Sequence, residues 1–173
     1  MSIIRTNQIT DTSGNGTPSF PNGIAGSVLQ VKNAILTTQF SFTNTSFADI
    51  TGLTVTITPI SSSSKMLITA HLGAVSGGGS HAQMFGFVRD STVIGQSTAS
   101  ATTLAAFGQY YGSNTQYFAP MSGQVLDEPN TTNQITYKLQ GKTSGSTTFI
   151  NRWAADASQF GFSSNITVME IGG

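Results

Sequence analysis

The chain has 173 residues, and only 8% of them are Asp, Glu, Lys or Arg, with seven basic and seven acidic side chains that give a formal net charge of zero. The length favours one domain, and the absence of basic clusters excludes the usual electrostatic footprint of a nucleic-acid-binding protein. With no cysteine, no run of about 18 apolar residues and no basic, apolar leader, the sequence predicts no disulfide, no membrane insertion and no export through a signal peptide.

Residues 1–27 predict an extended segment rather than a folded layer. Between positions 11 and 23 the chain carries three glycines and two prolines, so neither a helix nor a central strand can run through it. Such a segment is either a docking strap or a loose end. A strap would add its backbone to a partner's sheets and place apolar side chains in the partner's pockets. The side chains spaced for this attachment are Ile3, Ile4, Ile9, Phe20 and Ile24.

Residues 28–173 predict an all-β domain. Apolar residues recur at every second position in short runs that small polar residues separate, which is typical of half-buried strands. Residues 53–58 are the clearest run, and we expect them to form a hairpin with residues 66–75. Residues 89–95 have turn chemistry between short apolar pieces. The expected strands are 28–36, 39–43, 53–58, 66–75, 82–89, 104–111, 116–126, 135–140, 147–151 and 166–171.

Ten short strands without a convincing helix predict an antiparallel β-sandwich or jelly roll of two packed sheets. Most of the aromatic side chains should fill the core between these sheets. The phenylalanines expected there are Phe40, Phe42, Phe47, Phe85, Phe87, Phe149, Phe160 and Phe162.

The candidates for catalysis are few, and we expect no enzyme, no catalytic residue and no cofactor. His71 and His81 are the only histidines, and across a hairpin they could approach each other and hold a metal ion with a third ligand. The stronger interpretation places His71 against a neighbouring sheet or subunit, and we predict no metal site. On a trimer axis, one histidine could still bind an ion. Asp127 and Glu128 are adjacent in a loop and predict a solvated turn rather than an acid and base pair.

One group of aromatic residues combines apolar rings with polar tips, as surfaces that bind sugars or proteins often do. The alternative is that these rings are buried in the core. The candidate contact residues are Tyr110, Tyr111, Tyr117 and Trp153.

Several short segments of the sequence resemble segments of virion appendage proteins from marine and cyanobacterial tailed phages. The first two are IIRTNQITDTSGNG at 3–16 and FPNGI at 20–24. Within the body, DITGLTVTITP at 49–59, SSSK at 62–65, RDSTVIG at 89–95, TYK at 136–138 and ITVMEI at 166–171 resemble the β domain of the same proteins. The resemblance covers nearly the whole chain. The group includes tail fibres, fibre tips and capsid-bound knobs, so the resemblance does not decide between head and tail.

This resemblance implies a virion structural protein with a trimeric jelly roll like those of tumour necrosis factor or C1q. The protein would be made in the host cytoplasm and displayed on the virion surface. Residues 1–27 would attach it to other virion proteins of capsid or tail, and the domain at 28–173 would contribute to adhesion through a host glycan or envelope protein. The short leader favours a small knob, a decoration or an adapter over a full-length fibre, and the function we expect is that of a surface-projecting knob or short fibre. The alternatives are a capsid decoration protein without a receptor role and, more remotely, a carbohydrate-binding or hydrolytic jelly roll.

Overall fold

Strands form where apolar and small polar residues alternate in the sequence. In β9 (Ile135–Thr143) every second side chain is buried and those between them are partly exposed, and β11 (Ser164–Ile171) repeats the pattern. The computed structural model describes residues 25–99, 104–111 and 117–173, and its regular elements there are all β-strands. The other strands are β1 (Val28–Leu36), β2 (Phe40–Phe42), β3 (Ala48–Ile57), β4 (Lys65–Gly77), β5 (His81–Arg89), β6 (Thr92–Ile94), β7 (Phe107–Tyr111), β8 (Ala119–Asp127) and β10 (Thr148–Ile150).

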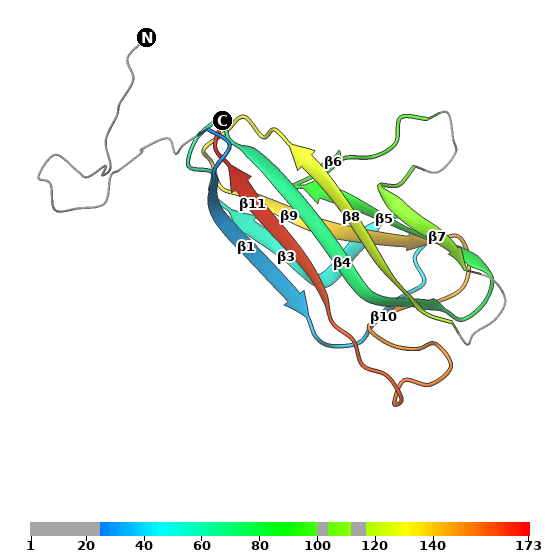
Figure 1. Ribbon diagram of the computed structural model, residues 1–173. Helices are drawn as coiled ribbons and strands as arrows, with labels where there is room; N and C mark the ends of the chain where they lie inside the picture. Colours follow the sequence, from blue (N-terminus) through cyan, green and yellow to red (C-terminus); the bar gives the residue numbers. More distant parts are fainter. Residues whose placement is uncertain (1–24, 100–103, 112–116) are drawn as a thin grey trace, which may run out of the picture.

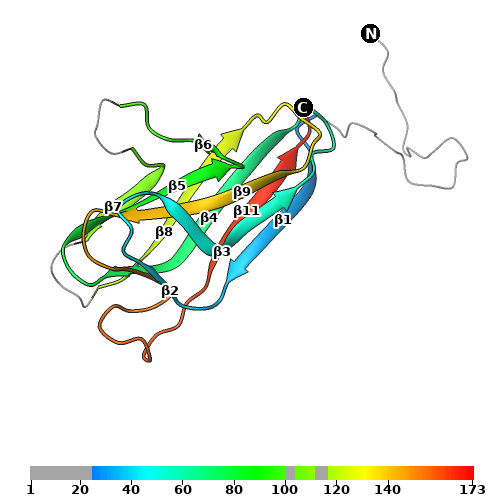
Figure 2. The same cartoon turned by 180° about the vertical axis from the view of Figure 1, so that it is seen from behind.

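The strands form two antiparallel sheets, which Figures 1 and 2 show from opposite sides. The first, here called sheet A, has the order β1-β11-β4-β10-β2, with β8 on the other edge of β4. Along β4, β11 pairs with residues 65–71 and β10 continues in its place at residues 75–77. The second, here called sheet B, has the order β3-β9-β5-β6, with β7 also paired to β5. The predicted all-β, antiparallel sandwich is confirmed.

The hydrophobic core lies between the two sheets. It includes the fully buried rings of Phe85, Phe87 and Tyr137, and branched side chains from β3, β4 and β11 fill the space around them. Burial of each apolar side chain of this size stabilises the folded state by about 1.5–3 kcal/mol. The inward face of every long strand is therefore fixed, and function must use the outer faces or the two ends of the sandwich.

The two ends of the sandwich differ in what they carry (Figure 1). At one, here called the terminal end, the start of β1 lies beside the C-terminus: Gly26 N donates to Gly172 O at 2.7 Å, and Gly172 N donates to Ser27 O at 2.8 Å. At the other, here called the loop end, lie the turns from β4 to β5 and from β9 to β10, together with residues 151–163. The chain thus enters and leaves the sandwich at the same end.

The predicted hairpin between residues 53–58 and 66–75 is wrong. Strand β3 belongs to sheet B, where it pairs with β9, whereas β4 lies in sheet A between β11 and β8. The link between them carries the chain from one sheet to the other. The buried carboxylate of Glu170 holds this link, because its Oε1 accepts hydrogen bonds from Ile60 N at 2.7 Å and Ser61 N at 3.4 Å. A polar linker of this length serves a crossover as well as a hairpin.

The loop around Asp127 is also more ordered than the sequence predicted. Asp127 is paired with Arg89, and Tyr137 Oη donates to its Oδ2 at 2.7 Å, so it does not lie in a solvated turn. Glu128 forms an exposed ion pair with Lys65. The turn chemistry predicted at residues 89–95 is confirmed: Asp90 has a φ of 52°, and the turn joins β5 to the short strand β6.

Candidate functional site

The predicted attachment segment meets the domain at the terminal end. Ile3, Ile4, Ile9, Phe20 and Ile24 lie outside the described residues. Residues 25–27 are described, and their backbone bonds to Gly172 fix the point at which the chain enters the sandwich. Residues 25–27 therefore join the sandwich at the terminal end.

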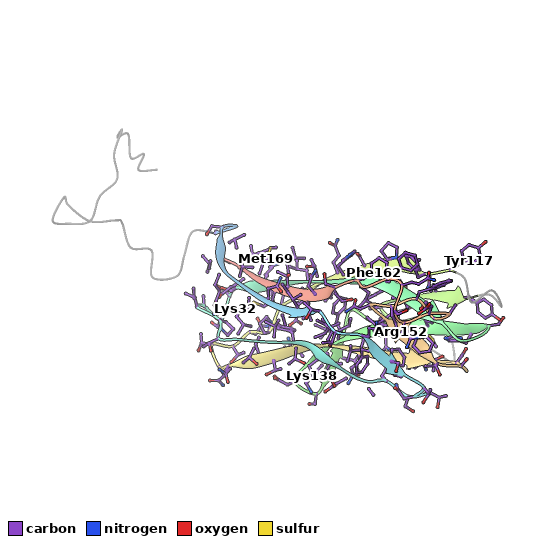
Figure 3. The ribbon with its side chains drawn as sticks, turned by 90° about the horizontal axis from the view of Figure 1, so that it is seen from below. Lys32, Tyr117, Lys138, Arg152, Phe162 and Met169 are labelled. Carbon is purple, nitrogen blue, oxygen red and sulfur yellow. The ribbon has the colours of Figure 1, made fainter. Side chains whose placement is uncertain are left out.

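The structure divides the four predicted contact residues. Tyr110 on β7 and Tyr117 before β8 are 74% and 66% exposed, and both lie at the loop end, where Figure 3 shows Tyr117. The side chain of Tyr111 lies outside the described residues. Trp153 is partly buried and packs edge-to-face on Phe160, with ring centroids 5.8 Å apart. The two described tyrosines are exposed, and the tryptophan belongs to a separate cluster.

This aromatic cluster consists of Phe118, Trp153, Phe160 and Phe162. The ring of Phe118 lies 4.9 Å from that of Phe162 and 5.6 Å from that of Phe160, centroid to centroid. The prediction that Phe160 and Phe162 fill the core is wrong, since they pack against each other and Phe118, and Phe160 is 43% exposed. Pairs of this geometry add about 0.5–1.5 kcal/mol each beyond the area they bury. The cluster is an ordered apolar surface at the loop end.

A glycine allows the cluster to lie on sheet A. At Gly73 in β4, a Cβ atom would stand 2.3 Å from the carbonyl oxygen of Ser163 and 3.2 Å from the Cβ of Phe162. Any larger residue would push this segment off the strand. Residues 162–163 therefore cross the outer face of β4, and Figure 3 shows Phe162 on the same side of the molecule as Met169 of β11.

Other phenylalanines also lie outside the sandwich. Phe47 covers Gly86 on sheet B, and the Lys142 ammonium lies 5.3 Å from the centre of its ring. Phe149 carries the Arg152 guanidinium over its ring at 4.4 Å. Phe42, Phe85 and Phe87 are buried in the core, and Phe40 packs against it, as predicted. The alternation of apolar and polar residues along a strand does not by itself show which aromatic rings face outward.

Asn151 positions the loop that carries the cluster, and the sequence reasoning missed it. Its φ of 62° turns the chain out of β10, and its buried amide nitrogen donates to the carbonyl oxygens of Leu36 and Thr38 at 2.8 and 3.0 Å. Its side-chain oxygen accepts a hydrogen bond from Ser164 Oγ at 2.6 Å. The asparagine at the end of an expected strand is the sequence feature that could have indicated this turn, because Asn adopts positive φ more readily than most other residues with a side chain.

The two histidines are not brought together. His71 is exposed on the outer face of sheet A, with Nδ1 2.9 Å from Ser122 Oγ. His81 is buried at the start of β5 in sheet B, with Nδ1 2.6 Å from Gly79 O and Nε2 3.1 Å from Thr148 Oγ1. Within the described ranges, no group of three or more His, Asp or Glu side chains could hold a metal ion. Nor do these ranges contain a helix with the length and apolar character that a membrane crossing needs.

Comparison of the sequence with known protein families and with curated proteins gives no match. Among solved structures, a chain in a structure of infectious bursal disease virus, Gx strain, is similar to this one with a TM-score of 0.40 and 14% identity over 84% of this chain. This chain spans 43% of the length of that viral chain.

Proposed function

We propose that this chain is a structural protein of a tailed-phage virion, a trimeric knob or short fibre that its N-terminal segment anchors to the particle. The observation that carries this proposal is the opposition of the two ends. The attachment segment enters beside the C-terminus at the terminal end, whereas the exposed tyrosines and the aromatic cluster lie at the loop end. An anchored module needs this arrangement, because it must bind the particle at one end and present a surface at the other.

Attachment would use strand addition. Residues 1–10 contain no glycine or proline, so their extended backbone can pair with a partner's sheet edge, and the isoleucines and Phe20 of the segment supply apolar plugs for pockets between strands. Ile3, Ile4, Ile9, Phe20 and Ile24 are the proposed plugs. The partner is another virion protein of the capsid or tail.

The loop end would make the contact with the host. Tyr110 and Tyr117 are exposed and offer rings with a polar tip, which suits both sugars and protein surfaces. Phe160 adds an exposed apolar ring from the aromatic cluster. We propose a host surface glycan or an envelope protein as the ligand, with Tyr111 and Trp153 as further candidates from the sequence.

Deletion of residues 2–24 tests the anchor. The truncated chain should fold, since the core and the hydrogen bonds of Gly26 and Ser27 to Gly172 remain, but it should be absent from purified particles. A full-length chain in which Ile3, Ile4 and Ile9 are changed to serine is the matched variant, because it keeps the whole backbone and removes three of the five proposed plugs. Normal incorporation of the truncated chain would overturn the anchor.

A further inference from the structure

The outer face of sheet A contains far fewer charged side chains than the outer face of sheet B. Strands β1, β11, β4 and β8 lie side by side, and three successive rows of outward side chains cross all four strands by register. None of the side chains in these three rows is Asp, Glu, Lys or Arg. The rows are Val31, Met169, Leu67 and Leu126; Asn33, Thr167, Thr69 and Gln124; and Ile35, Asn165, His71 and Ser122. The next row toward the terminal end contains Val28, Ile171 and Lys65, and there Lys65 forms an ion pair with Glu128.

The first row is a continuous apolar stripe. Val31 pairs with Met169, Met169 with Leu67, and Leu67 with Leu126, so one apolar side chain from each of four neighbouring strands lies at the same level. Val31 and Leu126 at its two ends are 53% and 52% exposed. Single exposed apolar residues are common on protein surfaces, but an aligned stripe across four strands indicates a surface that another molecule covers.

The polar side chains of this face partly satisfy one another. Asn33 Nδ2 donates to Thr167 Oγ1 at 3.1 Å, and His71 Nδ1 lies 2.9 Å from Ser122 Oγ. Between β4 and β8 the face has a hollow of about 420 Å³ lined by residues 69–71 and 122–124. Polar groups that already have hydrogen-bond partners have a smaller desolvation penalty when a second molecule excludes water. Burial of this face therefore costs little free energy.

Sheet B shows what a solvated face of this fold looks like. Lys138 Nζ donates to Asp49 Oδ2 at 2.9 Å, and Gln140 Nε2 donates to Asp49 Oδ1 at 2.7 Å. These hydrogen bonds, that of Gln140 foremost, lower the pKa of Asp49. Lys142 lies on the same face, over the ring of Phe47. Among the described charged residues, Asp49, Lys138 and Lys142 lie on the outer face of sheet B, Lys65 and Glu128 pair at the terminal end, and Arg152 and Asp156 lie at the loop end, so the three rows on sheet A contain none of them.

We infer that the outer face of sheet A is the surface through which copies of this chain associate, so that a second copy covers the apolar stripe. The three rows carry no charge, the ion pair beside them is balanced, and the chain has a formal net charge of zero, so two copies can meet there without repulsion. A nucleic acid or an anionic lipid surface would need a cluster of cations, whereas the one lysine at the edge of this face, Lys65, is paired with Glu128. Four strands about 4.8 Å apart and about seven residues long give roughly 400 Å² of flat area, a large part of the ~800 Å² that each partner buries in a standard interface.

This inference rests on the proposed oligomer, and a pair of lysine variants tests the face. Val31→Lys with Leu126→Lys places two charges on the stripe at positions that are exposed in the single chain, so folding should persist. Thr54→Lys with Val93→Lys is the matched control on the outer face of sheet B, where Val93 is 49% exposed. In size-exclusion chromatography with light scattering, the wild type and the control should have a multiple of the 18.1 kDa chain mass, and the stripe variant should have the mass of one chain. Circular dichroism checks that both variants fold.

The outcomes separate the two proposals. If the wild type has the mass of one chain, both the oligomer and this face are overturned. If the wild type and both variants remain oligomers, the oligomer stands and the assignment of the face is overturned.

A second measurement needs no disruptive change. Because the chain has no cysteine, Gln124→Cys and Thr54→Cys each introduce one thiol, on sheet A and sheet B respectively. In the wild-type oligomer a maleimide should label Thr54→Cys quickly and Gln124→Cys much more slowly, and the stripe lysines should abolish the difference. Equal labelling rates within an intact oligomer would overturn the inference.

Discussion

The hydroxyl of Ser164 donates a 2.6 Å hydrogen bond to the side-chain oxygen of Asn151, and this pair closes the loop that carries the aromatic cluster. Asn151 follows the last residue of β10 and Ser164 is the first residue of β11, so both ends of the loop are fixed by one buried contact. The amide of Asn151 also reaches back to the end of β1. The shape of the loop end therefore depends on one buried asparagine.

Asn151→Ala should lower the free energy of unfolding by about 3 kcal/mol, because it leaves two carbonyl oxygens and one hydroxyl without their buried partner and keeps a positive φ that alanine disfavours. Asn151→Gly loses the same hydrogen bonds but accepts the φ, and it should be less destabilised than alanine by about 1 kcal/mol. Chemical denaturation measures both. Equal stability of wild type and Asn151→Ala would contradict the assigned role.

Gly123→Ala should destabilise the fold by about 1–3 kcal/mol, because the new Cβ would stand 2.2 Å from the Phe107 ring, which is stacked on Phe85 in the core. Gly161→Ala is the matched control, since a Cβ there meets nothing within 4 Å, and it should change stability by less than about 0.5 kcal/mol. Thermal unfolding compares the two. An unaffected Gly123→Ala protein would mean that Phe107 does not pack as described.

Alkaline pH should destabilise the protein through Tyr137. Burial, reinforced by the hydrogen bond to Asp127, raises the pKa of Tyr137 above its usual value of 10.0. Above pH 10 the unfolded chain ionises this tyrosine while the folded chain keeps it neutral, so stability is complete below pH 10 and falls by about 1.4 kcal/mol per pH unit above it. Denaturation at pH 8 to 11.5 should show this fall in the wild type and a smaller one in Tyr137→Phe. Identical pH profiles would refute the prediction.

Replacement of both Tyr110 and Tyr117 by alanine should reduce adsorption of particles to host cells by about tenfold or more, the usual effect of removing an aromatic hot spot. Because both rings are exposed, stability should not change. Val93→Ala, an exposed apolar residue of β6 away from the loop end, is the control and should adsorb normally. Normal adsorption of the tyrosine variant would remove the loop end as the host contact.

The strands could be predicted because their faces are chemically distinct. In β3, Leu53, Val55 and Ile57 are buried and the threonines between them are exposed, as the alternation indicates. The partner of a strand was not predictable in the same way, because the link after β3 is compatible with either sheet. Register is a long-range property: β4 pairs with β11 and β8, which are distant in sequence.

The outward rings and the neutral face were harder to predict than the strands. Phe160 and Phe162 alternate as core residues do, and only the close approach of residues 162–163 to Gly73 shows that they lie outside. Likewise, a low number of charges was evident from the sequence, but the absence of charges from three neighbouring rows of sheet A was not. The uncharged row of Val31, Met169, Leu67 and Leu126 emerges only when four strands are placed in register.

If the chain is a tailed-phage virion protein as proposed, electron cryomicroscopy of the purified virions tests the central proposal most directly. The account predicts the sandwich on the particle surface in groups of three, with the terminal end and residues 1–27 against a capsid or tail protein and the loop end directed outward. Density on the head or on the tail would also separate a capsid decoration from a tail-fibre component. Virions that lack the protein, or that hold it with the loop end against the particle, would contradict the account.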